Sequence, residues 1–154
     1  MKTLQAGDKA PQFSLQNQND ETVSLADFAG KKVLVYFYPK AMTPGCTVQA
    51  CDFRDNMERL SSNDLVVLGV SKDSEKSHKN FIEKQSLNFS LLLDEDLELH
   101  NKYGVWREKS MYGKKYMGTS RSTFVIGSDG KIKFAKYNVK SKGHVDLLIS
   151  ELGL

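Results

Sequence analysis

Apolar residues along the chain occur either in short continuous runs or at helical spacing. Residues 33–38 and 65–70 are almost entirely apolar, which is typical of strands that are covered on both faces of a sheet. In residues 47–61, apolar positions recur every three or four residues, which predicts a helix. These three segments form a β-α-β unit, and such a unit places its two strands parallel in one sheet.

The same patterns predict shorter elements in the rest of the chain. They are a hairpin of 13–15 and 22–25, a helix capped by Asp73 or Ser74, a strand at 89–93, a helix at 97–103 ended by Gly104, strands at 122–126 and 131–137, and a helix at 145–152. The Asp-Gly pair of Ser128-Asp129-Gly130 suits a type I′ turn between the last two strands. Residues 105–118 have no clean period and are predicted to form a long loop. Together these elements predict an α/β protein with one domain over residues 1–154, in which helices flank both faces of a mixed central β-sheet.

Composition and charge exclude several classes of protein. The chain has 154 residues, 22 of them basic and 19 acidic, and the two signs are mixed along it. A nucleic-acid binder needs its basic residues concentrated, and Lys114-Lys115 between Tyr112 and Tyr116 is the only approach to that pattern. Neither a secretory signal nor an apolar segment of about 18 residues is present. We therefore expect a cytoplasmic protein with no nucleic-acid or membrane partner.

Cysteine and histidine usage indicates redox chemistry rather than metal binding. The chain contains two cysteines, Cys46 and Cys51, and a close pair in a reducing compartment suggests redox cycling or a metal site. Zinc would need four ligands, whereas His78, His100 and His144 fall in separate predicted helical segments. We expect no metal, and each histidine is predicted to lie at the surface or a helix edge. Apolar helix residues such as Met57 and Phe81 are predicted to be core.

Cys46 stands at the predicted junction between the strand at 33–38 and the helix that follows it. Backbone N–H groups at a helix start lack partners, and the positive end of the helix dipole points the same way. Both effects favour a thiolate over a thiol, so this placement predicts a reactive cysteine.

Several motifs around this junction resemble one known family. They are Pro39-x-x-x-Thr43-x-x-Cys46, Cys51 five residues further on, and Arg121 within Gly118-Thr-Ser-Arg-Ser-Thr-Phe124. The stretches Gly7-Asp-Lys-Ala-Pro11-x-Phe13, Tyr36-Phe-Tyr-Pro39 and Tyr103-Gly-Val-Trp106 follow the same pattern in the same order. The chain is similar over nearly its whole length to the peroxiredoxin family, specifically its bacterioferritin comigratory protein (peroxiredoxin Q) branch.

The resemblance implies a thioredoxin-like fold and a thiol peroxidase that reduces hydrogen peroxide and organic hydroperoxides. It implies no metal or organic cofactor and favours a monomer. We further predict that thioredoxin reduces the Cys46–Cys51 disulfide, because strained or exposed disulfides are readily reduced. Matched to the family motif, Cys46 is the peroxidatic thiol that forms a sulfenic acid, and Cys51 is the resolving thiol. Thr43 and Arg121 are the polar partners of thiolate and peroxide, and Pro39 shields the pocket. Gln49 stands where many members have Glu, and we expect this change not to touch the four reactive positions.

Taken without the resemblance, each residue has an ordinary interpretation. Arg121 at a strand start would be a surface ion-pair partner, Thr43 before Pro44 a turn residue, and Cys46 a small buried hydrophobe on the stripe of Ala50 and Phe53. Two other functions also remain open. A thioredoxin-like dithiol oxidoreductase would share the fold, but such enzymes use C-x-x-C spacing. A non-enzymatic chaperone or binding module would need a basic patch or an exposed apolar run, and the sequence shows neither.

The spacing of the two cysteines has a structural consequence. Residues five apart in a helix are about 8.6 Å apart at Cα, beyond the roughly 7 Å that a disulfide tolerates. We therefore predict that the first turns of the helix, from about residue 45 to 53, unwind when Cys46 and Cys51 form a disulfide.

Overall fold

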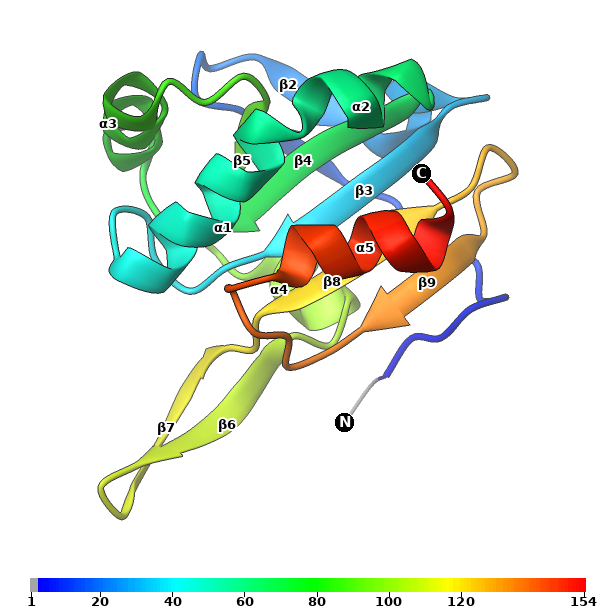
Figure 1. Ribbon diagram of the computed structural model, residues 1–154. Coiled ribbons are helices and arrows are strands. Elements are labelled where there is room, and N and C mark those ends of the chain that lie inside the picture. The colour runs from blue at the N-terminus through cyan, green and yellow to red at the C-terminus, as the bar shows by residue number, and fades with distance from the viewer. Residues whose placement is uncertain (1–2) are drawn as a thin grey trace.

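The computed structural model describes residues 3–154, and its centre is a five-stranded sheet in the order β5-β4-β3-β8-β9 (Figure 1). The strands are β3 (Lys32–Phe37), β4 (Leu65–Ser71), β5 (Ser90–Leu93), β8 (Ser122–Ile126) and β9 (Ile132–Lys136). β3 is parallel to β4, and β4 to β5, whereas β8 is antiparallel to both β3 and β9. The predicted mixed sheet is confirmed.

Alternate side chains of β3 enter two cores on opposite faces of the sheet. Leu34 and Tyr36 lie in one core, and Val35 and Phe37 in the other. The first core is covered by α1 (Pro44–Asp55), α2 (Met57–Ser62), α3 (Glu75–Gln85) and α5 (His144–Leu152), and the second by the N-terminal segment, the 3-10 helix η1 (Leu25–Phe28) and α4 (Glu98–Lys102). The burial of both β3 faces explains its continuous apolar sequence.

Several local predictions are confirmed. β1 (Ser14–Gln16) and β2 (Thr22–Ser24) form the N-terminal antiparallel hairpin. Ser74 caps α3, because its side chain accepts a hydrogen bond from the Ser77 backbone N–H at 3.2 Å. Phe81 is fully buried, and Met57 packs against the same core.

The helix predicted over 47–61 is in fact two helices. α1 ends at Asp55, α2 begins at Met57, and Asn56 between them has φ −104° and ψ 7°. The Asn56 side chain donates a hydrogen bond to the Asp52 backbone oxygen at 2.8 Å. Such a side-chain bond competes with the helical backbone bonds and favours a break at this position. The spacing of the apolar residues continues across the break, so the sequence pattern does not show it.

The loop predicted over 105–118 is wrong. Residues Trp106–Met111 form β6 and Lys114–Thr119 form β7, an antiparallel hairpin that projects from the body of the molecule (Figure 1). Its turn residues Tyr112 and Gly113 both have positive φ, as a type I′ turn requires. Because most side chains of this hairpin are exposed, neither face needs to be apolar and no alternation marks the strands.

The turn between β8 and β9 also differs from the predicted type I′. Of its residues, Gly130 has positive φ (82°), whereas Asp129 does not. The Gly130 N–H donates to the Gly127 oxygen at 3.0 Å, and the Asp129 carboxylate accepts from the Lys131 N–H at 3.0 Å. The Asp-Gly pair therefore marks the turn correctly, but only its glycine adopts the left-handed conformation.

The prediction that the three histidines lie at the surface or a helix edge is wrong, because all three are buried. His78 Nε2 lies 2.9 Å from Tyr38 Oη, His100 Nδ1 lies 2.6 Å from Asp94 Oδ2, and His144 Nε2 lies 2.7 Å from Thr123 Oγ1. These partners lie 40, 6 and 21 residues away along the sequence, respectively, so the spacing of the histidines does not reveal that their rings have hydrogen-bond partners in the core.

Two of these histidines make stability depend on pH. Burial lowers the pKa of His78 and of His144 to about 4. In the unfolded chain both rings bind a proton below about pH 6.5, so between these values the unfolded state binds up to two more protons. We expect the free energy of unfolding to fall by about 2 kcal/mol per pH unit as pH drops from about 6 to 5. Urea unfolding in wild type and His144→Gln measures this. The variant should show about half the slope, and a flat wild-type profile would contradict the prediction.

Candidate active site

Cys46 is the third residue of α1, directly after the loop that leaves β3. Pro44 occupies the first helical position, where its missing N–H costs nothing. The Cys46 side chain is only 2% exposed and packs in the core beneath α1. The predicted strand-to-helix junction is therefore present, with the sulfur at the positive end of the helix dipole.

Arg121 is brought to this sulfur by the pairing of β8 with β3. Ser122, the residue after Arg121, is paired with Phe37 at the end of β3, so Arg121 lies at the edge of the sheet from which the Cys46 loop leaves. Its Nη2 donates a hydrogen bond to Cys46 Sγ at 3.2 Å, across 75 residues of sequence. Arg121 is half-buried and belongs to none of the ion pairs found among residues 3–154, so its interpretation as a surface ion-pair partner is wrong.

Gln49 also contacts the site, contrary to the expectation that it touches no reactive position. Arg121 Nη1 donates to Gln49 Oε1 at 2.6 Å, and the Gln49 side chain is completely buried. The two ends of one guanidinium therefore hold the cysteine and the glutamine, which lie one helical turn apart on the same face of α1. The Gln49 amide is uncharged, so it orients the Arg121 guanidinium without neutralising the positive charge that faces the sulfur. In the sequence, the three-residue spacing from Cys46 to Gln49 already indicates that the two side chains share one face of the helix.

Gly45 lies at the start of α1 beside the Arg121 guanidinium and Ser141. A Cβ atom at this position would lie 3.4 Å from Arg121 Nη2 and 3.2 Å from Ser141 Oγ. Ser141, from the segment before α5, is thus a further neighbour of the site. No sequence pattern pointed to Ser141, because only the tertiary fold brings it here.

Thr43 is the N-cap residue of α1, and Pro39 stands in the loop that joins β3 to this helix. The Thr43 hydroxyl donates to the Lys40 backbone oxygen at 2.7 Å, which leaves its lone pairs free to accept a hydrogen bond from a bound molecule. Pro39 follows β3 and is half-buried. The loop is anchored where the Ala41 N–H donates to Asp73 Oδ2 at 2.8 Å.

Cys51 lies further along the same helix and is half-buried, with its Sγ 3.5 Å from Gln85 Oε1. Both cysteines are free thiols and both belong to the unbroken helix α1. In this state the helix geometry keeps them too far apart for a disulfide, as the sequence predicts.

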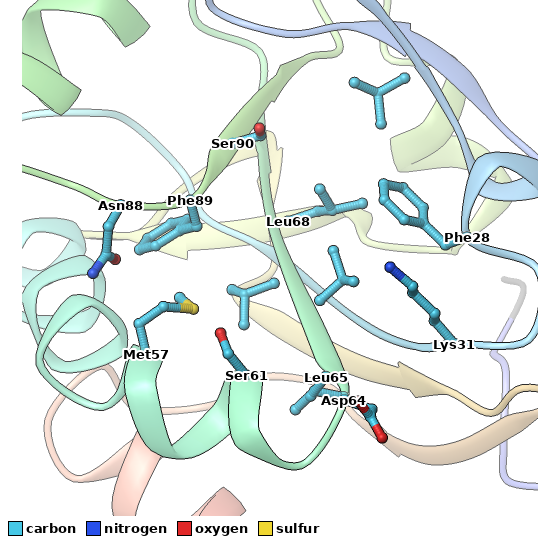
Figure 2. Close-up of a pocket in the computed structure, with 13 residues that line it drawn as sticks. Phe28, Lys31, Met57, Ser61, Asp64, Leu65, Leu68, Asn88, Phe89 and Ser90 are labelled. Atoms are coloured by element: carbon cyan, nitrogen blue, oxygen red, sulfur yellow. The ribbon is translucent and has the colours of Figure 1, made fainter.

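The cavity drawn in Figure 2 lies away from this chemistry. Its lining includes Lys31, Asp64 and Leu65, at the start of β3 and of β4, whereas Cys46 follows the other end of β3. Within residues 3–154, no group of three or more His, Cys, Asp or Glu is arranged to hold a metal ion. Across that same part of the chain, no helix combines the length and apolar character needed to cross a membrane.

Comparison with known proteins shows the family to which this chain belongs. The family model described as AhpC/TSA matches residues 6–135. The chain belongs to the AhpC/TSA family. It is also similar to the peroxiredoxin Bcp of Escherichia coli K12, with 51% identity over 152 residues that make up 99% of this chain and 97% of the relative.

Solved structures related to the AhpC/TSA family match the fold over nearly its whole length. The bacterioferritin comigratory protein of Xanthomonas campestris, which has alkyl peroxide reduction activity, is 35% identical with a TM-score of 0.88, covering 98% of this chain and 96% of that one. A cysteine-to-serine variant of Xylella fastidiosa PrxQ is 31% identical with a TM-score of 0.91. The match covers 99% of this chain and 97% of that one. The resemblance to the peroxiredoxins and the thioredoxin-like fold that it implied are confirmed.

Proposed function

We propose that Cys46 carries the thiol peroxidase activity of this peroxiredoxin, with Cys51 as its resolving thiol. The substrates are hydrogen peroxide and organic hydroperoxides, in keeping with the alkyl peroxide reduction activity of the Xanthomonas campestris relative. The observation that carries the proposal is the hydrogen bond from Arg121 Nη2 to Cys46 Sγ, 3.2 Å long, at a helix N-terminus.

In the first step, the Cys46 thiolate attacks one peroxide oxygen and the O–O bond breaks. Sulfur takes up the attacked oxygen with its hydrogen and is oxidised to a sulfenic acid. The other oxygen leaves with the bonding pair and takes a proton from solvent, as water or an alcohol. Negative charge grows on the leaving oxygen, so donors already in place stabilise the transition state more than the ground state. Arg121 supplies those donors, the Thr43 hydroxyl accepts a hydrogen bond from the peroxide, and Pro39 shields the site from water.

Ionisation of the thiol explains only a small part of such a rate. For a cysteine in general, a hundredfold greater acidity raises the thiolate fraction at pH 7 by about 25-fold, but each thiolate becomes roughly 8-fold less nucleophilic. The net gain is about threefold. Most of the rate must therefore come from the donors that meet the breaking O–O bond.

In the second step, the Cys51 thiol attacks the sulfenic acid and releases water, which gives an intramolecular disulfide. Because intact α1 holds the two residues too far apart, its first turns must unwind, and the break at Asn56 limits how far the unwinding spreads. Thioredoxin then reduces the exposed disulfide by thiol exchange. The protein acts as a single-domain cytoplasmic monomer, with no metal, organic cofactor or nucleic-acid partner.

The two other functions are less well supported. A dithiol oxidoreductase would need cysteines that close without unwinding, whereas here both belong to one unbroken helix. A non-enzymatic binding module gives no reason for a guanidinium to contact a buried sulfur.

Cys51→Ser separates these functions in a peroxide-consumption assay driven by thioredoxin. We expect wild type to turn over continuously, whereas Cys51→Ser consumes one equivalent of peroxide at the wild-type initial rate and then stops. Mass spectrometry should find the added oxygen on Cys46. Continued thioredoxin-driven turnover by the variant would contradict the role of Cys51, and consumption of no peroxide by wild type would contradict the peroxidase function.

A further inference from the structure

Tyr36, in β3, and Tyr38, just after β3, point into the same core but differ in their hydrogen bonding. Tyr36 and Tyr38 are both about 1% exposed. The Tyr38 hydroxyl lies 2.9 Å from His78 Nε2. The Tyr36 hydroxyl is buried without any hydrogen-bond partner in the part of the chain that the structure describes. A buried donor left unpaired destabilises the state in which it is buried.

The unpaired hydroxyl belongs to a ring that lies directly beneath α1. The Tyr36 ring stacks on Phe53 of that helix, with 4.5 Å between ring centroids, and both residues share a core with Cys46. Burial first, and the neighbouring charge of Cys46 second, raise the pKa of Tyr36 far above its usual value. The hydroxyl therefore stays protonated and remains a donor close to the reactive thiol.

The ring has little freedom to seek a partner elsewhere. A Cβ atom at Gly69, which pairs with Tyr36 across the sheet, would lie 3.1 Å from both Cε1 and Cζ of the tyrosine. The Tyr36 ring therefore packs directly against the Gly69 backbone as well as against Phe53. A partner must come to the hydroxyl, and the element above it is α1.

Helix α1 has other weaknesses in the same region. Its N-cap residue, Thr43, makes no side-chain capping bond, because the hydroxyl is bonded to the Lys40 oxygen instead. The Gln49 side chain lacks a partner for Nε2. Among residues 3–154 three buried side-chain polar atoms are unpaired, and two of them, on Tyr36 and Gln49, lie where β3 meets α1.

We propose that Tyr36 is a positioning residue for the resolution step: its unpaired hydroxyl lowers the cost of unwinding α1 and so speeds formation of the Cys46–Cys51 disulfide. While α1 is intact the hydroxyl has no acceptor. When the first turns unwind, their backbone carbonyl groups are released and solvent enters. The Tyr36 hydroxyl can then donate a hydrogen bond to one of these acceptors. The unwound state is thereby favoured relative to the helix. This proposal rests on the function proposed above.

Tyr36→Phe tests the proposal, and Tyr38→Phe is its matched control, since each removes one hydroxyl from the same strand face. Cys46 is oxidised with one equivalent of hydrogen peroxide, and timed samples are analysed by mass spectrometry for sulfenic acid, trapped with a dimedone reagent, and for disulfide. We expect Tyr36→Phe to form sulfenic acid at the wild-type rate but to convert it to disulfide about tenfold more slowly. Tyr38→Phe should show no such slowing.

Two further measurements on the same variants complete the test. Amide hydrogen exchange over residues 46–53 of the reduced protein should be slower in Tyr36→Phe than in wild type, and faster in the oxidised than in the reduced wild type. Urea unfolding should show Tyr36→Phe to be at least as stable as wild type. Disulfide formation at the wild-type rate, equal slowing in both variants, or a loss of stability in Tyr36→Phe would overturn the proposal. Absence of both sulfenic acid and disulfide in oxidised wild type would instead contradict the proposed function.

Discussion

Cys46→Ser is expected to reduce thioredoxin-driven peroxide consumption to the background of the assay. Reduction of the O–O bond requires an atom that can donate an electron pair and be oxidised, and the serine oxygen cannot form the counterpart of a sulfenic acid. Nor is a serine hydroxyl ionised near neutral pH. Loss of peroxide, followed by a colorimetric or electrode assay, measures the effect.

The Cys51→Ser protein provides the comparison for this result. It has the same Cys-to-Ser change on the same helix, five residues away, yet should still consume one equivalent of peroxide. Circular dichroism and urea unfolding should show that both variants fold. If Cys46→Ser still turned over peroxide with thioredoxin, Cys46 could not be the attacking thiol.

Arg121→Lys is expected to slow oxidation of Cys46 by hydrogen peroxide about 100-fold, the scale of losing one donor to a developing oxyanion. The arginine holds Gln49 through Nη1 and Cys46 through Nη2. A lysine keeps the charge but presents it at a single nitrogen on a flexible stem, so it cannot make both contacts in the same geometry. Quench-flow oxidation in the Cys51→Ser background, in which the reaction stops after one step, measures the rate directly.

Arg107→Lys is the matched control for that substitution. Arg107 is also half-buried, but it donates to the Gly104 oxygen at 2.7 Å and lies over the Tyr137 ring instead of contacting Cys46. We expect it to change stability without changing the rate of Cys46 oxidation by more than about twofold. Equal rates in Arg121→Lys and Arg107→Lys would show that the guanidinium at the sulfur has no special role.

The sequence predicted the architecture well where burial imposes a pattern. The run at 33–38 had to be a strand covered on both faces, and the helical spacing that begins near Cys46 had to follow it, so the junction that holds the thiol could be located. The hairpin of β6 and β7 was missed for the converse reason, since its mostly exposed residues need no alternation.

The site was predicted less completely, because its contacts span long stretches of sequence. The motif placed Arg121 beside Cys46 only through the family resemblance, since no local pattern links residues 75 apart. Gln49 was set aside as a change of charge, although its position one turn after Cys46 put it within reach of the same guanidinium. The buried histidines and Tyr36 depend on where distant elements pack, which neither periodicity nor composition encodes.

We propose that Arg121 acts on the breaking O–O bond and does more than hold a thiolate. The most direct test compares two reactions of Cys46 in the Cys51→Ser background, oxidation by hydrogen peroxide and alkylation by iodoacetamide, with Arg121 intact and in Arg121→Lys. Both reactions need the thiolate, but only the first breaks an O–O bond. In Arg121→Lys we expect oxidation to slow about 100-fold while alkylation changes by less than about tenfold. Equal changes in the two rates would contradict it.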